Sequence, residues 1–199
     1  MIQKQDLFNR YSEIFVPSFI IHPDETPEGF CVTLTEDDST AKLRRLIVKN
    51  VPSNTILIPL HEYSHLGIGN KLKAILRDDP GIFMCCDYLL AAMTKDYAYF
   101  VFIELKSNRI NLSDVKKQFK GASCMAEYFN AIGAHFYNLR KSELSAFELR
   151  YVLISVSKLN KRPTKRASSA KYSTPDEFFH HKVAVENHEA SVPLGLLLS

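Results

Sequence analysis

The sequence predicts an α/β protein with a mixed central β-sheet flanked by helices. Two adjacent runs rich in aromatic and branched residues, 82–93 and 97–106, predict a pair of strands. Apolar side chains three and four positions apart across residues 112–129 are typical of an amphipathic helix, and residues 150–156 form an apolar run typical of a buried strand. From Asp87 onward, the predicted order is therefore strand, strand, helix, strand.

The length and composition indicate one soluble domain. A chain of 199 residues holds one substantial core and is short for two domains. We expect the core at residues 82–156, an N-terminal extension at 1–81, and a basic loop with C-terminal strands at 157–199. No apolar run is long enough to cross a bilayer, and the N-terminus lacks the layout of a signal peptide. The net charge of +3 does not by itself indicate nucleic acid.

The four cysteines show no Cys-x-x-Cys spacing. That pattern indicates reduced core thiols in a cytoplasmic protein and disfavours a disulfide framework or a zinc site.

The remaining elements are expected to be short, because proline and glycine interrupt the chain. The residue pattern predicts a helix at 3–15, a hairpin of strands at 30–35 and 43–48, a strand at 54–60, and a helical turn or two at 71–76. Asn111 or Ser113 can cap the long central helix. A Ser-, Lys- and Pro-rich loop is expected at 157–176, and a strand or two at 183–198.

Three charged residues stand out in the two paired runs. If Lys95 and Asp96 form a two-residue loop, counting back along both strands puts Asp87 opposite Glu104, with Cβ atoms about 4.5–5.5 Å apart. Lys106 lies two residues beyond Glu104 and therefore on the same face. Two carboxylates and an ammonium group thus converge in an otherwise apolar sheet.

Both faces of the second strand are predicted to be buried. Val101 and Ile103 line one face, while Phe100 and Phe102 share the other with Glu104. Solvated charges are not expected in such a central strand, so the site interpretation is favoured over an ordinary exposed Glu–Lys pair. Like charges this close repel and are costly to bury unless they are neutralised. A divalent cation would neutralise them.

This arrangement resembles the PD-(D/E)xK nuclease superfamily, which has the restriction-endonuclease-like fold. The matching residues are Asp87 in one strand and Glu104 and Lys106 in the next, followed by a helix and a strand. In several branches of that family a Gln on the following helix points into the site, and Gln118 fits that position. The usual Pro before the Asp is replaced here by Cys86.

The resemblance implies a metal-dependent nuclease, with Mg²⁺ or Mn²⁺ held by Asp87 and Glu104. Lys106 would stabilise the developing charge or help to position and deprotonate water, and Gln118 would orient the water or Lys106. Some family members add a Glu from an N-terminal helix. Glu13 is the natural candidate for this role, and position 62 is the alternative.

The substrate implied by the resemblance is nucleic acid, with DNA favoured over RNA. Restriction, repair or phage defence would suit a small nuclease of this type, by analogy alone. Cutting both strands of a duplex would favour a homodimer or a larger defence or repair complex. The alternative is a non-catalytic subunit that keeps the fold and binds nucleic acid or a partner protein.

Residues 61–65 match His-Glu-x-x-His, the zinc peptidase pattern, which needs a helix to bring His61 and His65 to one metal ion. Pro59 precedes the motif, and Gly67 and Gly69 follow where the helix should continue. No third ligand at a suitable spacing is evident. A loop or strand end with surface histidines is therefore the favoured interpretation, with a zinc peptidase as the alternative.

Two other groups of charged residues are interpreted without a catalytic role. Asp114 and Lys116 also fit Asp-x-Lys, but they lie in the first turn of the long helix, where Asp114 interacts favourably with the helix dipole. His180, His181 and His188 have a spacing that fits no common metal site, so we expect them to be surface residues.

A run of basic residues without one acidic residue follows the last strand of the predicted core. It comprises Lys158, Lys161, Arg162, Lys165, Arg166 and Lys171. A solvated loop is one interpretation. The other is an arm that contacts backbone phosphates, because such clusters supply sequence-independent affinity for nucleic acid. We expect this basic run to set affinity and not chemistry.

Overall fold

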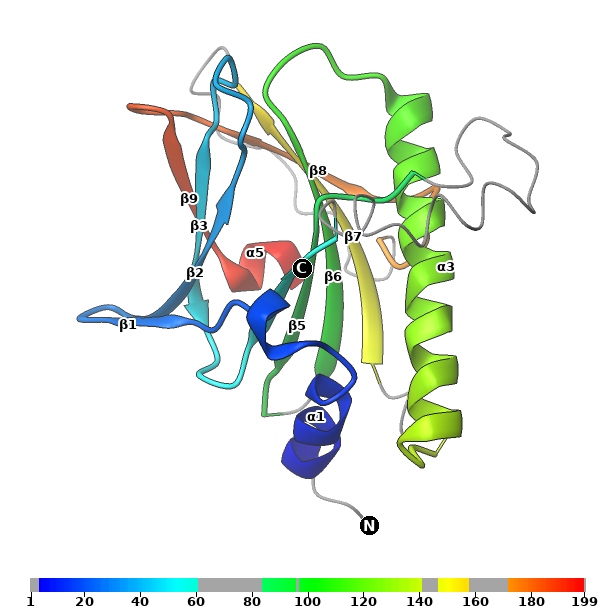
Figure 1. The fold of residues 1–199 in the computed structure, drawn as a ribbon. Coiled ribbons are helices and arrows are strands. Elements are labelled where there is room, and N and C mark those ends of the chain that lie inside the picture. Colours follow the sequence, from blue (N-terminus) through cyan, green and yellow to red (C-terminus); the bar gives the residue numbers. More distant parts are fainter. Residues whose placement is uncertain (1–3, 61–83, 96, 141–146, 158–171, 199) are drawn as a thin grey trace.

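The computed structural model describes residues 4–60, 84–95, 97–140, 147–157 and 172–198 (Figure 1). Within these residues the helices are α1 (Lys4–Ser12), the 3₁₀ helix η1 (Pro17–Phe19), α3 (Leu112–Phe136) and α5 (Leu194–Leu198). The strands are β1 (Asp24–Thr26), β2 (Gly29–Thr35), β3 (Arg45–Val51), β4 (Ile56–Pro59), β5 (Tyr88–Met93), β6 (Ala98–Lys106), β7 (Phe147–Val156), β8 (Phe179–Val183) and β9 (Glu189–Pro193).

A five-stranded mixed sheet forms the centre of the molecule, in the order β4-β5-β6-β7-β8. Antiparallel pairing joins β4 to β5 and β5 to β6, whereas β6, β7 and β8 are parallel neighbours. Helix α3 carries the chain from the end of β6 back to the start of β7, as a parallel pair requires. The predicted order of strand, strand, helix, strand is therefore confirmed.

A second, four-stranded sheet has the order β1-β2-β3-β9. Strands β2 and β3 are the predicted antiparallel hairpin. Strand β9 joins β3 in parallel, with Leu46 beside Ala190 and Val48 beside Val192. This long-range pairing builds a sheet from two segments more than a hundred residues apart, so local residue patterns do not reveal it.

The two sheets and the helices form layers (Figure 1). Helices α1 and α3 cover one face of the five-stranded sheet, where Phe100 and Phe102 pack with Phe119. The four-stranded sheet covers the other face, where Val101 and Ile103 face its apolar side chains. The predicted α/β class is confirmed, with helices on one face of the central sheet and a second sheet on the other.

Helix α3 begins where its sequence predicts. The Asn111 side chain caps the helix by accepting a hydrogen bond from the Ser113 backbone N–H. Its buried residues recur three, four or seven positions apart and form one stripe against the sheet: Val115, Phe119, Ala122, Ala126, Phe129 and Gly133. The first turn of α3 lies at the end of the sheet where β6 finishes (Figure 1).

The shorter predicted elements have mixed outcomes. The helix predicted at 3–15 is present as α1, and the strand predicted at 54–60 as β4. The C-terminal segment provides β8 and β9, and it ends in helix α5, which was not predicted. The helical turn predicted at 71–76 lies outside the described residues. Among those described, no helix is long and apolar enough to cross a membrane.

Candidate active site

The β5–β6 hairpin has the predicted register. Met93 pairs with Ala98 and Tyr88 pairs with Ile103, so the next position along the strands sets Asp87 opposite Glu104. The Thr94 N–H donates to the Tyr97 carbonyl oxygen over 2.8 Å, which closes the turn. Across the strands, the Leu105 N–H donates to Asp87 Oδ2 over 2.7 Å, so the Asp87 carboxylate is held at the end of β6.

Glu104 is fully buried, with 0% of its surface exposed. It lies on the α3 side of the sheet, because Phe100 and Phe102, which share its face by the period of two, pack against that helix. Lys106, on the same face, forms an ion pair with Glu104 Oε1. Within the described residues this carboxylate has no regular hydrogen bond, and the Gln118 side chain is its other polar neighbour.

The electrostatics of the three charged groups are coupled. Burial, followed by the nearby Asp87 carboxylate, raises the pKa of Glu104 to about 8, although Lys106 and Gln118 act in the opposite direction. Burial works against the charged form of Lys106, but Glu104 and Asp87 outweigh it and leave the Lys106 pKa above its ordinary value. Lys106 is therefore a cation at neutral pH, and Glu104 holds its proton to a higher pH than an exposed carboxyl group does.

Gln118 reaches the site from α3, as predicted. Its Nε2 donates to the Cys85 carbonyl oxygen over 3.5 Å, and its Oε1 is buried without a hydrogen-bond partner in the described part of the chain. One turn further along α3, Gly121 lies under the segment that leads into Asp87. A methyl group on Gly121 would lie 1.7 Å from the Met84 carbonyl oxygen, so this close approach requires glycine.

The end of β2 and the segment between β2 and β3 hold both strands of the site from the other side. The Tyr88 hydroxyl, next to Asp87, donates to the Thr35 carbonyl oxygen over 2.6 Å and accepts from the Thr35 N–H over 3.0 Å. The Ser107 hydroxyl, next to Lys106, donates to the Leu43 carbonyl oxygen over 3.2 Å and accepts from the Leu43 N–H over 3.1 Å. These bonds fix the backbone on either side of the charged residues.

Three polar residues that the sequence analysis did not connect with the site lie on the same face. Strand β7 places Ser155 beside Lys106, and β8 places Lys182 beside Ser155. His180 is near the surface, as expected, but its Nε2 lies 2.8 Å from the Ser155 hydroxyl oxygen. Ser155 is buried within an apolar strand, and that signal, which singled out Glu104, would have found it in the sequence.

Other predicted residues lie elsewhere. Glu13 is exposed after α1, which packs near the far end of α3, where Tyr11 donates to Asn130. Asn130 is twelve residues beyond Gln118, about 18 Å along the helix, so Glu13 does not complete the site. The alternative at position 62 lies outside the described residues.

The prediction for Asp114 is confirmed, since it lies in the first turn of α3 and accepts a hydrogen bond from Asn111. Lys116 faces Asp176 at 3.7 Å and does not join the site. Both the His-Glu-x-x-His motif at 61–65 and the basic run at 158–171 lie outside the described residues, so those two predictions stand as predictions.

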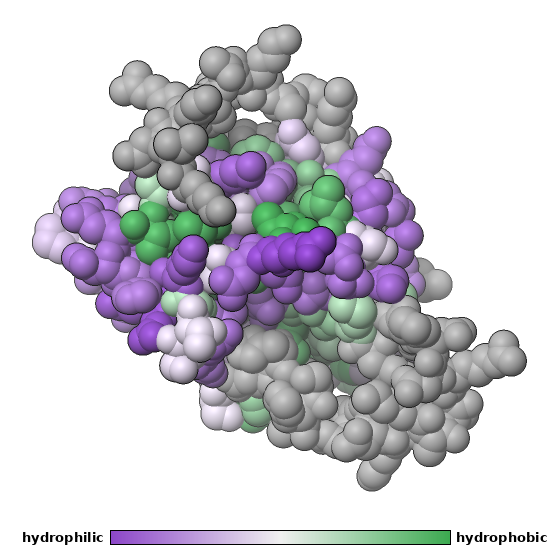
Figure 2. Space-filling view, turned by 90° about the horizontal axis from the view of Figure 1, so that it is seen from above, coloured by the Kyte–Doolittle hydropathy of each residue, from purple (hydrophilic) through white to green (hydrophobic). Residues whose placement is uncertain are grey.

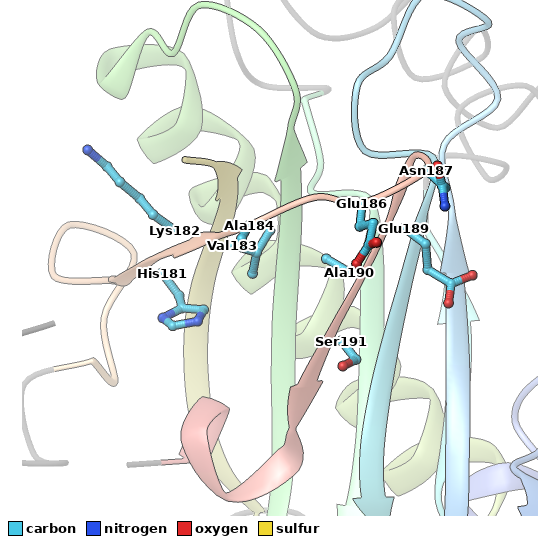
Figure 3. Close-up of a pocket in the computed structure, with 9 residues that line it drawn as sticks. All are labelled: His181, Lys182, Val183, Ala184, Glu186, Asn187, Glu189, Ala190 and Ser191. Carbon is cyan, nitrogen blue, oxygen red and sulfur yellow. The ribbon is translucent and has the colours of Figure 1, made fainter. Parts of the chain in front are cut away.

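The end of the molecule at which β6 and β7 finish is seen from above in Figure 2. Among the coloured residues of this face hydrophilic ones predominate, and hydrophobic patches lie between them near the middle of the view. A separate open pocket of about 600 Å³ lies where β8 and β9 diverge (Figure 3). Its two carboxylates come from Glu186 and Glu189, and Glu189 pairs with Arg45 at 3.0 Å. This pocket contains neither Asp87 nor Glu104.

The residues present fit a hard divalent cation. Two carboxylates converge, the Glu104 oxygens and Gln118 Oε1 are buried without regular hydrogen bonds, and all of these are oxygen donors. The described residues contain no group of three or more His, Cys, Asp or Glu side chains around one point. A cation here would therefore complete its coordination with water, which is how Mg²⁺ is commonly held.

Comparison of the chain with protein-family models, with curated proteins and with solved structures gives no match.

Proposed function

We propose that this protein is a metal-dependent nuclease of the PD-(D/E)xK type that hydrolyses phosphodiester bonds, in DNA in preference to RNA. The observation that carries the proposal is Glu104, a fully buried carboxylate opposite Asp87 that has one ammonium partner, Lys106. A second carboxylate beside a buried one is unfavourable in a purely structural core. Grouped acids of this kind, with a raised pKa, are typical of catalytic sites.

Asp87 and Glu104 would hold Mg²⁺ or Mn²⁺. When bound, the cation supplies Lewis-acid stabilisation of phosphate oxygens and lowers the pKa of a water molecule. The Asp87 carboxylate is already oriented by the Leu105 N–H. Glu104 is fixed by burial, so the two oxygen donors are positioned before any ligand arrives.

Of the two roles expected for Lys106, stabilisation of developing negative charge is the better supported. Its raised pKa keeps it protonated at neutral pH, which suits a cation and not a base. Gln118, anchored to the Cys85 carbonyl, presents its buried Oε1 as an acceptor that would orient a water molecule or Lys106.

The basic run at 158–171 remains our candidate for the arm that contacts backbone phosphates. The last described residue before it, Ser157, follows Ser155 and Val156 at the carboxyl end of β7, beside the Lys106 end of β6. A cytoplasmic role in restriction, repair or phage defence suits this proposal. Of the four cysteines predicted to be core residues, Cys86 is buried, Cys31 and Cys85 are partly buried, and Cys124 is exposed, so the core placement is wrong for Cys124. Cutting both strands of duplex DNA would favour a homodimer or a larger complex.

The decisive experiment measures cleavage of DNA and RNA with Mg²⁺, with Mn²⁺ and with EDTA. Isothermal titration of Mg²⁺ and Mn²⁺ into the wild type and the Asp87→Ala variant runs in parallel. We expect metal-dependent cleavage, stopped by EDTA, and metal binding that Asp87→Ala removes. Cleavage that persists in EDTA, or that survives Glu104→Ala, would refute the proposal.

A non-catalytic subunit of the same fold is the second candidate. The ion pair between Lys106 and Glu104 favours it, because this pair partly neutralises the buried carboxylate without any metal ion. In that case the wild type would bind nucleic acid or a protein partner, but it would neither take up Mg²⁺ at Asp87 nor cleave any substrate. The same titration therefore separates the two candidates.

A further inference from the structure

A row of polar side chains continues from the carboxylate pair across the sheet toward β8. Lys106 on β6 lies beside Ser155 on β7, which lies beside Lys182 on β8. Adjacent strands are about 4.8 Å apart, so the Cα atoms of Lys106 and Lys182 are separated by about 10 Å. The row thus places a hydroxyl group between two ammonium groups at the end of three parallel strands.

All three side chains lie on the α3 side of the sheet. Tyr151 and Leu153, which share the face of Ser155, belong to the core beneath α3. On β8, Phe179 and Val183 pack on the opposite face, and the period of two therefore directs His180 and Lys182 to the α3 side. Figure 3 shows the Lys182 side chain and the His181 ring leaving β8 in different directions.

Ser155 is held in one orientation. It is 1% exposed, and its hydroxyl oxygen lies 2.8 Å from Nε2 of His180. Burial, then the charges of Lys182 and His181, lower the pKa of His180, so its ring is neutral at neutral pH. The positive charge of this part of the row therefore comes from Lys182, for which no ion pair is found among the described residues.

We propose that Ser155, His180 and Lys182 form a binding subsite for a second backbone phosphate of the nucleic acid, adjacent to the phosphate that is cleaved at the carboxylate pair. This inference rests on the proposed function. Lys182 supplies an ammonium donor, and the Ser155 hydroxyl is a second donor in the His180 tautomer that carries its proton on Nε2, because that N–H then donates to the Ser155 oxygen and leaves the hydroxyl proton for a phosphate oxygen. A metal ion would instead need deprotonated oxygen or nitrogen ligands. Lys182 binds the phosphate directly, and His180 is a positioning residue that acts through Ser155.

The structure offers two matched controls. His181 is the neighbour of His180 but faces the other side of the sheet and lies against Phe179. Lys95 is an exposed lysine in the β5–β6 turn, at the opposite end of the strands from Lys106. His181→Gln and Lys95→Ala therefore remove the same chemical groups as His180→Gln and Lys182→Ala without touching the row.

The binding test uses a fluorescein-labelled single-stranded DNA oligonucleotide with Ca²⁺, on protein that also carries Glu104→Gln so that it does not cleave. Lys182→Ala should weaken binding about tenfold, the worth of one charge-assisted hydrogen bond, and reduce the log–log salt slope by about one unit. Lys95→Ala should change neither value. In the active protein, His180→Gln should raise KM about fivefold with little change in kcat, and His181→Gln should not.

Contact between the ligand and His180 can be measured directly by NMR, from the imidazole proton resonances of the histidines. Addition of a 5′-phosphorylated dinucleotide should shift the His180 signal and leave the His181 signal in place. A merely structural Ser155–His180 pair would lower the melting temperature in His180→Gln but would leave the salt slope and the His180 resonance insensitive to ligand.

The outcomes separate this inference from the proposed function. If the wild type cleaves DNA while Lys182→Ala and His180→Gln match their controls, the subsite is refuted and the nuclease stands. If no nucleic acid is cleaved but the oligonucleotide binds in a Lys182-dependent way, the subsite stands and the nuclease is refuted. Absence of measurable oligonucleotide binding to the wild type would overturn both.

Discussion

The two ends of the interface between α3 and the five-stranded sheet differ in chemistry although they share one face of the same strands. At the end near α1, the rings of Phe100 and Phe147 stack with centroids 4.1 Å apart, and Tyr11 lies 5.0 Å from Phe100. At the other end, four and six residues after Phe100 along β6, the face carries Glu104 and Lys106 instead.

The aromatic end stabilises the folded state, because each buried ring removes a large apolar area from water. The charged end has none of this benefit. Desolvation opposes the ionised form of Glu104, and Asp87 adds repulsion. The packing of one end is favourable and the charge of the other is costly, and we therefore propose that the charged end is kept for binding a ligand.

Replacing either site carboxylate should remove DNA cleavage while leaving the fold stable. Asp87→Ala and Glu104→Ala should each lower the rate of DNA cleavage by at least about a thousandfold, because electrostatic stabilisation of the transition state is lost. The melting temperature should fall little or rise. The control is Glu13→Ala, which removes an exposed carboxylate at the α1 end and should leave the rate unchanged. A Glu104→Ala protein with normal activity would contradict the assignment.

Truncating the aromatic end should have the opposite consequence. Phe100→Ala removes a ring that is 1% exposed and should lower the free energy of unfolding by about 3–5 kcal/mol, measured by urea denaturation. Activity per folded molecule should be retained at a temperature where the variant stays folded. Phe136→Ala is the matched control, because Phe136 is 79% exposed and its loss should cost little. Equal effects of the two variants would show that the aromatic end does not carry the stability.

How well the sequence predicts these regions depends on the range of the interactions. The register that opposes Asp87 and Glu104 follows from one short turn and the period of two, and both are local. The cap at Asn111 and the apolar stripe of α3 are local as well. Residue types alone therefore indicated which face of β6 would carry the charges.

The features that were missed depend on contacts between distant segments. The pairing of β9 with β3 is set by packing across the core. It joins the predicted N-terminal hairpin to a C-terminal strand and so forms a second sheet. The position of Ser155 beside Lys106 depends on the parallel register between β6 and β7, which no turn fixes. Glu13 was misassigned because the sequence does not specify the end of the sheet against which α1 packs.

The pH dependence of the free energy of unfolding measures the cost of the buried Glu104 carboxylate without any assay of catalysis. The folded-state pKa of Glu104, about 8, lies above its usual value of 4.5. The folded protein therefore binds an extra proton between these values, so this contribution to stability is fully present below pH 4.5 and is lost as pH rises through 8. Between pH 5 and pH 9, metal-free wild type should lose on the order of 2–4 kcal/mol relative to Glu104→Gln, measured by urea denaturation.

Metal provides the control for that measurement. Mg²⁺ at about 100 times its dissociation constant should stabilise the wild type by about 2.7 kcal/mol at pH 8 and should not stabilise Glu104→Gln. Wild-type and variant stabilities that run parallel across the pH range would show that Glu104 titrates normally and that the charged end imposes no cost.

The smallest effect is expected at Gly121, where α3 supports the segment that leads into Asp87. Gly121→Ala should force this segment away from the helix, because the added methyl group would lie 1.7 Å from the Met84 carbonyl oxygen. Overpacking of this kind should cost about 1–3 kcal/mol of stability, and the shift of Asp87 should also weaken Mg²⁺ binding. Gly195→Ala in α5 is the control, since nothing lies within 4 Å of the added group, and alanine there should be neutral or slightly stabilising. Gly121→Ala with unchanged stability and unchanged Mg²⁺ affinity would show that the close contact between α3 and the Met84 segment does not position the site.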